Sequence, residues 1–150
     1  IKYLDIRNKL RKLGHSYDLL VTYREDIRDK EGDGGFFEED DLLRGALENE
    51  LRVCAQVCID ISYAIASLEN LLKANVDENP IVILGRANIL PEDFVRRFKG
   101  VVNFRNIIVH EYDEINYRMV SENLGKLNDF KEFATYVVKY LEKGIKERGD

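Results

Sequence analysis

The sequence predicts an all-α protein, an antiparallel bundle of four to five helices, and three observations support this prediction. Apolar residues recur every three or four positions through most of the chain, which is the period of an α-helix. The stretches EGDGG and ANVDENP separate the periodic segments with helix-breaking glycine and proline. One short run, IVIL at residues 81–84, could form a strand, but no other segment offers it a pairing partner.

Length and composition predict one soluble domain spanning residues 1–150, long enough to bury a substantial core. Hydrophobic residues make up 45% and charged residues 34% of the chain, as in globular proteins. No apolar run approaches the length that spans a bilayer and no signal peptide leads the chain, so we expect a cytoplasmic protein that does not bind membranes. The net charge of −5 disfavours broad attraction to nucleic acid but leaves room for a small basic cleft.

Two long helices are expected in the first half of the chain. The first covers about residues 2–29 and has an apolar stripe made up of Ile6, Leu10, Leu13, Tyr17, Leu20 and Ile27. The second has the longest stripe, made up of Leu43, Leu47, Leu51, Cys54, Cys58, Ile61, Ile65, Leu68 and Leu72. Such a stripe is typical of the central helix of a bundle, and the valines and alanines beside it predict a second packing face, available to another subunit.

Two further helices are expected in the second half. Pro80 is expected to fix the end of the second helix, and IVIL is interpreted as a packed connector. Pro91, followed by two acidic residues, is expected to open a third helix that continues into RNIIVHEY at residues 105–112. A last helix is expected over about residues 116–147, with apolar positions at Val120, Leu124, Leu127, Phe130, Phe133, Val137, Leu141 and Ile145.

The two cysteines, Cys54 and Cys58, are expected to be small core residues rather than a redox pair. They lie four positions apart on one helix, where a disulfide would cross-link nothing distant. They also lack the further ligands that a zinc site needs, and free cysteine is among the most buried residue types. We therefore expect neither a metal nor a cofactor.

The third helix carries two stripes. One is polar and partly basic, made up of Arg96, Lys99, Asn103, Asn106 and His110. The other is apolar except for one arginine, and consists of Phe94, Phe98, Val101, Arg105, Ile108 and Tyr112. An arginine on a packing face needs either a partner or a wet cleft. It could form a buried ion pair with a carboxylate such as Asp60, or lie at the edge of a solvent-filled groove.

RNIIVHEY combines side chains suited to RNA cleavage without a metal. Asn106 and His110 lie on adjacent turns, so the amide can orient the imidazole for proton transfer. Arg105 can stabilise a phosphorane, although on an ideal helix it points about 140° away from His110. Two copies facing each other across a twofold axis would bring these groups together. A purely structural histidine at a helix end remains the alternative, as does a solvated face instead of phosphate contacts for Arg96 and Lys99.

RNIIVHEY resembles the signature of the HEPN superfamily, whose nucleases carry an arginine, four to six residues and then a histidine. The motif also resembles, more narrowly, the HepT toxin family of HepT/MntA toxin–antitoxin systems. In that family's pattern an arginine is followed by four residues, a histidine, any residue and a tyrosine. The similarity extends to ALENELRVCAQVCIDIS at residues 46–62 and to LPEDFVRRFKGVVNFRNIIVHEYDEI at residues 90–115.

This resemblance implies a HEPN-like helical homodimer, or a higher oligomer, that cleaves RNA as a metal-independent RNase toxin. Arg105 and His110 would be the catalytic pair, with Asn106 as the accompanying polar residue. From their place on the polar stripe, and not from the resemblance, we expect Arg96, Lys99 and Asn103 to bind RNA. Tyr112 would be the tyrosine that a cognate MntA-like minimal nucleotidyltransferase, the antitoxin, adenylylates from ATP to silence the toxin.

Two other functions are compatible with the same residues. A non-catalytic accessory subunit of a nucleotidyltransferase would bind nucleotide through Arg105 without cleaving RNA. A structural interaction module would use Arg105 in a buried ion pair, so its removal would cost stability and not activity. RNA cleavage assays, nucleotide or partner binding and melting curves distinguish the three.

Overall fold

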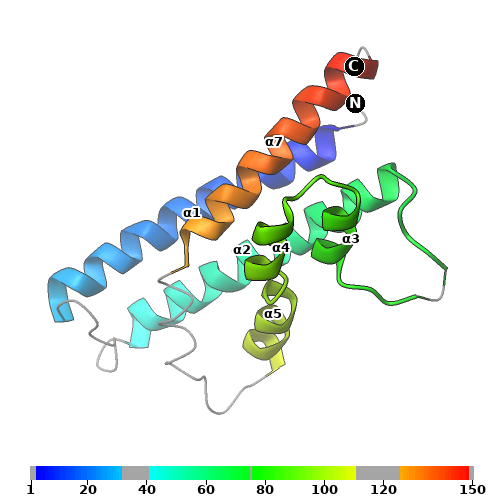
Figure 1. Ribbon diagram of the computed structural model, residues 1–150. Coiled ribbons are helices and arrows are strands. Elements are labelled where there is room, and N and C mark those ends of the chain that lie inside the picture. Colours follow the sequence, from blue (N-terminus) through cyan, green and yellow to red (C-terminus); the bar gives the residue numbers. More distant parts are fainter. Residues whose placement is uncertain (1–2, 32–40, 75, 111–125, 149–150) are drawn as a thin grey trace.

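The computed structural model describes residues 3–31, 41–74, 76–110 and 126–148, and every regular element in these ranges is helical (Figure 1). The helices are α1 (Leu4–Glu31), α2 (Asp41–Leu68), α3 (Pro80–Arg86), α4 (Glu92–Phe98), α5 (Val101–His110) and α7 (Asn128–Arg148). The predicted all-α class is confirmed. The EGDGG linker and the expected helical positions Val120 and Leu124 lie outside the described residues.

The three long helices form the body of the bundle. α1 runs antiparallel to α2 and also to α7, so that the first and last described turns lie at the same end of the molecule (Figure 1). The short helices α3, α4 and α5 lie on another side of α2, and α5 projects away from α7. α2 contacts α1, α3, α5 and α7, which makes it the central helix that its apolar stripe predicts.

The core follows the predicted stripes closely. On α2, the stripe positions with no exposed surface are Leu47, Leu51, Cys54, Cys58, Ile61 and Ile65. Ile6, Leu13 and Leu20 of α1 and Phe133 and Val137 of α7 pack into the same cluster. By length and composition alone, Gly45–Leu68 could cross a membrane, but 56% of this stretch is buried inside the bundle, as expected for its core helix.

The end of α2 differs from the prediction. The helix stops at Leu68, not at ANVDENP, because Asn70 adopts a left-handed conformation with φ 56°. The Leu71 amide then donates to the Ala66 carbonyl at 2.8 Å, and the Asn70 amide donates to the Ser67 carbonyl at 3.2 Å. This is a Schellman cap, in which the left-handed position is usually glycine and sometimes asparagine. Leu72 consequently leaves the stripe and is 47% exposed.

Pro80 starts a helix instead of ending one. It occupies the first turn of α3, where its missing N–H and restricted φ are favourable, and the Asn79 side chain caps the helix by accepting from the Ile81 amide at 3.0 Å. The IVIL segment interpreted as a connector is therefore helical. Ile81, Ile83 and Leu84 are buried against the bundle.

The single third helix expected from Pro91 onward is divided in two. α4 ends at Phe98 and α5 begins at Val101, with a turn at Lys99 and Gly100 between them. Glycine has a high entropic cost in a helix interior, which favours a break at this position. Arg105 and Asn106 therefore belong to a separate ten-residue helix, α5, while Arg96 belongs to α4.

Candidate functional site

α4 and α5 bury one continuous aromatic and aliphatic face. Phe94, Phe98, Val101 and Phe104 are all less than 9% exposed. The first three were predicted from spacing, but Phe104 was assigned to neither stripe. Counting three residues onward from Val101 reaches Phe104, and counting four reaches Arg105, so helical spacing alone does not decide between them. In the structure, Phe104 is the residue that packs into the core.

Arg105 consequently lies at the border of the buried face. It is half-buried, and its Nε atom has almost no exposed surface and no hydrogen-bond partner among the described residues. The ion pair considered with Asp60 is not found between the described residues, and the Asp60 carboxylate accepts from Gln56 Nε2 at 2.8 Å. A buried donor without a partner costs about 1–3 kcal/mol.

The polar residues near Arg105 are exposed. Asn103 and Asn106 lie on the solvent side of α5, and Arg96 and Lys99 are exposed on α4 and at the turn that follows it. α5 ends at His110, whose backbone lies one turn beyond Asn106. The side chain of His110 is not described, and Tyr112 lies outside the described residues. The structure therefore positions the arginine and amide of the motif, but not the imidazole or the phenol.

Arg97 has a different role from its basic neighbours. Its guanidinium donates to Glu132 Oε2 at 2.8 Å and to Asp129 Oδ1 at 3.5 Å, which ties α4 to α7. It also lies 5.4 Å from the centre of the Phe94 ring. Burial raises the pKa of Asp129, and the Arg97 charge partly opposes that rise. Of the three neighbouring cationic residues Arg96, Arg97 and Lys99, the first and last are thus left for an external ligand.

Both cysteines are buried and free, as expected for core residues. Burial raises the pKa of Cys54 to about 12, and the nearby Glu50 charge adds to the effect. Burial also raises the pKa of Cys58 well above its ordinary value. Both are therefore neutral thiols, unsuited to nucleophilic chemistry near pH 7.

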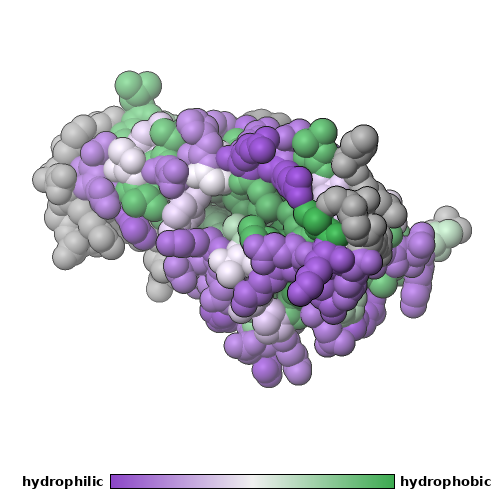
Figure 2. All heavy atoms as spheres, turned by 90° about the horizontal axis from the view of Figure 1, so that it is seen from above, coloured by the Kyte–Doolittle hydropathy of each residue, from purple (hydrophilic) through white to green (hydrophobic). Residues whose placement is uncertain are grey.

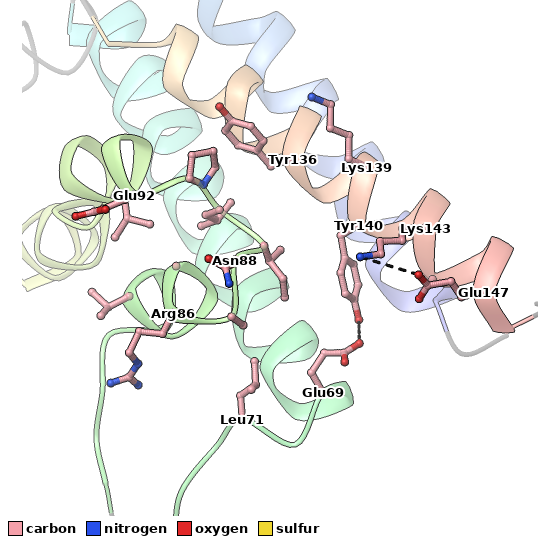
Figure 3. Close-up of a pocket in the computed structure, with 18 residues that line it drawn as sticks. Glu69, Leu71, Arg86, Asn88, Glu92, Tyr136, Lys139, Tyr140, Lys143 and Glu147 are labelled. Carbon is pink, nitrogen blue, oxygen red and sulfur yellow. Dashed lines mark hydrogen bonds and ion pairs between the residues drawn. The ribbon is translucent and has the colours of Figure 1, made fainter.

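A pocket of about 1130 Å³ that was not predicted lies between α7 and the turn joining α3 to α4 (Figure 3). α7 contributes a face that includes Tyr136, Lys139, Tyr140 and Lys143, spaced three and four residues apart. Tyr140 donates to Glu69 at 2.6 Å across one end of the pocket. From above, the molecule has a hollow with apolar atoms in its depth and hydrophilic side chains around it (Figure 2).

Comparison with known proteins identifies the family. The family model described as Ribonuclease HepT-like matches residues 16–137. The chain belongs to the HepT-like family. It is also 30% identical over 107 residues to the mRNA nuclease HepT of Shewanella oneidensis, an alignment that covers 71% of this chain and 80% of that protein.

Solved structures with the HepT-like fold are similar along most of the chain. The AMPylated HEPN toxin of Shewanella oneidensis, solved in complex with its MNT antitoxin, superposes with a TM-score of 0.70 at 26% identity and covers 89% of this chain and 96% of that one. A mutant of the MntA–HpeT toxin–antitoxin superposes with a TM-score of 0.73 at 24% identity and covers 89% and 98%. The latter likeness concerns the fold alone.

The HepT-like match covers the motif and only part of the pocket. Residues 16–137 include α2, α3, α4 and α5, and hence Arg105, Asn106 and His110. Lys139, Tyr140 and Lys143 lie beyond its end. The sequence does contain a signal for this polar face of α7. Four polar or amphipathic residues lie three and four positions apart in the last helix: Tyr136, Lys139, Tyr140 and Lys143.

Proposed function

We propose that this HepT-like chain is an RNase toxin that cleaves RNA without a metal, through Arg105 and His110, and is silenced by adenylylation of Tyr112. The observation that carries the proposal is half-buried Arg105, whose Nε has no hydrogen-bond partner in the described part of the chain, next to exposed Asn106 on a helix that ends at His110. The family match and the similarity to an mRNA nuclease support the same assignment.

The chemistry needs one proton shuttle and one cation. A base removes the proton of a ribose 2′-hydroxyl, the 2′-oxygen attacks the adjacent phosphorus, and the 5′-oxygen leaves with a proton, giving a 2′,3′-cyclic phosphate. We assign the proton transfers to His110, whose side-chain type titrates near neutral pH. Arg105 stabilises the charge that develops on the phosphorane oxygens. Asn106 orients the imidazole, one helical turn away.

RNA binding is assigned to the exposed polar side of α4 and α5. Arg96, Lys99 and Asn103 lie there, and two of them carry a positive charge in an otherwise acidic protein. Contacts of this kind position the phosphate backbone without selecting sequence. Arg97 is left out of the assignment because its guanidinium is held by α7.

We assign the active form to a homodimer. On an ideal helix Arg105 and His110 point about 140° apart, so one copy brings them together poorly. Two α5 helices related by a twofold axis would supply the arginine and the histidine to a shared cleft. The half-buried position of Arg105, at the border of the core, is compatible with an interface running along α5.

We assign the control of this site to a partner minimal nucleotidyltransferase. The phenolic oxygen of Tyr112 attacks the α-phosphate of ATP, pyrophosphate leaves and an AMP group remains on the tyrosine. Tyr112 lies seven positions after Arg105, about 20° away from it on an ideal helix. The added phosphate and purine would neutralise the arginine and fill the cleft.

The test is RNA cleavage by purified protein in EDTA. We expect His110→Ala and Arg105→Ala to lower the rate by about 100-fold or more, as for the loss of a general acid–base or an oxyanion-stabilising group. Lys131→Ala, an exposed position on α7, is the matched control and is expected to cleave normally. Equal, background-level cleavage by wild type and His110→Ala would reject the catalytic assignment. Intact mass after incubation with the partner and ATP, with Tyr112→Phe as control, tests the modification.

A further inference from the structure

The turn between α4 and α5 interrupts a hydrogen-bond ladder that would otherwise make them one helix. The Lys99 amide still donates to the Val95 carbonyl at 2.9 Å, and the ladder resumes where the Phe104 amide donates to the Gly100 carbonyl at 3.0 Å. In a continuous helix the Asn103 amide would donate to the Lys99 carbonyl. Between these two described residues that bond is not formed, so the Lys99 carbonyl is open to another donor.

The side chain of Asn79 supplies that donor. Its Nδ2 atom lies 2.9 Å from the Lys99 carbonyl oxygen, although the two residues are 20 positions apart in the chain. Its Oδ1 atom accepts from the Ile81 amide at 3.0 Å, which fixes the orientation of the amide group at the start of α3. A side chain that inserts into a backbone ladder is one of the causes of a helix kink. Asn79 thus takes the place that a backbone amide has in a straight helix.

The residue that carries this side chain is itself firmly placed. The Asn79 carbonyl accepts from the Ile83 amide at 3.1 Å, and Pro80 at the first position of α3 is buried. α3 packs on α2, and it also approaches α4 closely, because a Cβ atom on Gly85 would lie 2.7 Å from Val95 Cγ2. The bond from Asn79 therefore ties the α4–α5 turn to the body of the bundle.

The break lets the two short helices pack on different neighbours. α4 faces α7, where Arg97 donates to Glu132 at 2.8 Å and the Phe98 ring stacks on Phe133 with 5.3 Å between their centres. α5 packs on α2 and projects away from α7 (Figure 1). A straight helix could follow only one of these directions. The direction of α5, and with it the placement of Arg105, therefore depends on the turn.

We propose that Asn79 is a positioning residue of the ribonuclease site, and that its bond to the Lys99 carbonyl sets the angle at which α5 carries Arg105 and His110. The inference rests on the proposed function for the chemistry at α5. Asn79 transfers no proton and stabilises no charge in this reaction. Without its bond the first turn of α5 is loosened, so that fewer molecules hold the two catalytic groups in the arrangement that cleaves RNA. Small displacements of reacting groups cost large factors in rate.

The experiment compares RNA cleavage by Asn79→Ser with that by Glu78→Ala. Serine keeps an acceptor for the α3 cap, but its hydroxyl is too short to contact both the Ile81 amide and the Lys99 carbonyl. Glu78→Ala removes the neighbouring ion pair with Arg86 and leaves both bonds of Asn79 in place. We expect kcat to fall about tenfold or more in Asn79→Ser, with KM changed by less than about threefold. Glu78→Ala is expected to retain wild-type values of both.

Hydrogen exchange gives a second readout, which the loss of a helix cap alone would not produce. The bond to the Gly100 carbonyl protects the Phe104 amide in the wild-type protein. We expect Asn79→Ser to speed exchange at Phe104 by about fivefold or more, while the Ile83 amide of α3 exchanges as in wild type. Glu78→Ala should leave both amides unchanged. The pH–rate profile of Asn79→Ser should keep the wild-type midpoint at a lower maximum, because His110 still transfers the proton.

Three results overturn the proposal: a wild-type kcat in Asn79→Ser, a lower kcat with unaltered exchange at Phe104, or an equal loss of kcat in Glu78→Ala. If Asn79→Ser does not fold, Asn79→Asp, which also lacks the donor, provides the same comparison. Wild-type protein that cleaves no RNA would reject the ribonuclease assignment and the catalytic consequence drawn from it. Exchange at Phe104 would then decide by itself whether Asn79 holds the first turn of α5.

Discussion

The Nδ2 atom of Asn79 donates a hydrogen bond to the Lys99 backbone carbonyl at 2.9 Å. Its Oδ1 atom simultaneously accepts from the Ile81 amide at 3.0 Å and so caps α3. Lys99 lies in the turn where α4 gives way to α5. One amide thus fixes the start of α3 and the junction from which α5 carries Arg105.

Substitutions at Asn79 separate these two bonds. Asn79→Ala loses both, and we expect it to lower the free energy of unfolding by about 1–3 kcal/mol. Asn79→Asp keeps the cap acceptor but sets a carboxylate oxygen against the Lys99 carbonyl in place of the donor, so we expect a loss of about 1–3 kcal/mol. Urea denaturation measures both. An aspartate variant as stable as wild type would mean that the bond to Lys99 contributes nothing.

The Arg97 contact with α7 predicts a pKa change in Asp129. Removing the guanidinium removes the effect that lowers this pKa, so we expect Arg97→Ala to raise it further above 3.8. Because the native pKa lies above that of the unfolded chain, ionisation of Asp129 costs stability, and the cost grows as pH rises from 3.8 through the native pKa. NMR titration of the carboxyl carbon measures the change. Arg96→Ala, at the exposed neighbouring position, is the control and should leave the titration unaltered.

Two glycines in helices should respond oppositely to alanine. At Gly85 a Cβ atom would lie 2.7 Å from Val95 Cγ2, so we expect Gly85→Ala to destabilise by about 1–3 kcal/mol. Val95→Ala in the same chain should recover part of that loss. Nothing lies within 4 Å of the corresponding position at Gly14, and Gly14→Ala should stabilise α1 by about 0.5–1 kcal/mol. Chemical denaturation of the three variants tests the difference, and a Gly85→Ala protein as stable as wild type would contradict it.

Replacing Arg105 distinguishes a structural from a functional arginine. Its buried Nε has no hydrogen-bond partner within residues 3–31, 41–74, 76–110 and 126–148, so Arg105→Met removes an unsatisfied donor, and we expect equal or higher thermal stability. Cleavage of RNA should fall at the same time by about 100-fold or more. A destabilisation of about 3–5 kcal/mol would instead indicate a broken buried ion pair.

The buried thiols should be inert in the native protein. The pKa of Cys54, at about 12, and the raised pKa of Cys58 keep both in the neutral form at pH 7 and above, while only a thiolate reacts with maleimide. We expect no modification in buffer and two additions after denaturation, read by intact mass. Rapid labelling of the folded protein would show that α2 opens locally.

Helical periodicity predicted the parts of the fold where many positions agree. The eight stripe positions of α2 from Leu43 to Leu68 agree on one register, and the buried residues of α1 and α7 follow the same rule. The ends of the helices and the break between α4 and α5 were harder to predict, because each depends on the conformation of a single residue. Asn70 and Asn88 both take left-handed conformations that end helices, with φ 56° and 60°, yet asparagine is common elsewhere. Pro80 can follow a helix or begin one, and spacing does not distinguish these roles.

The amino-acid sequence by itself determined the all-α class, the central position of α2 and, through RNIIVHEY, the family of the protein. These are properties of repeated spacing and of a local motif, which need no knowledge of distant contacts. Only the tertiary structure decided that Phe104 enters the core while Arg105 stays at its border, that Arg97 is held by α7 and that a groove opens beside Tyr140. Each of these depends on which surfaces of two distant helices meet, and helical spacing carries no information about that.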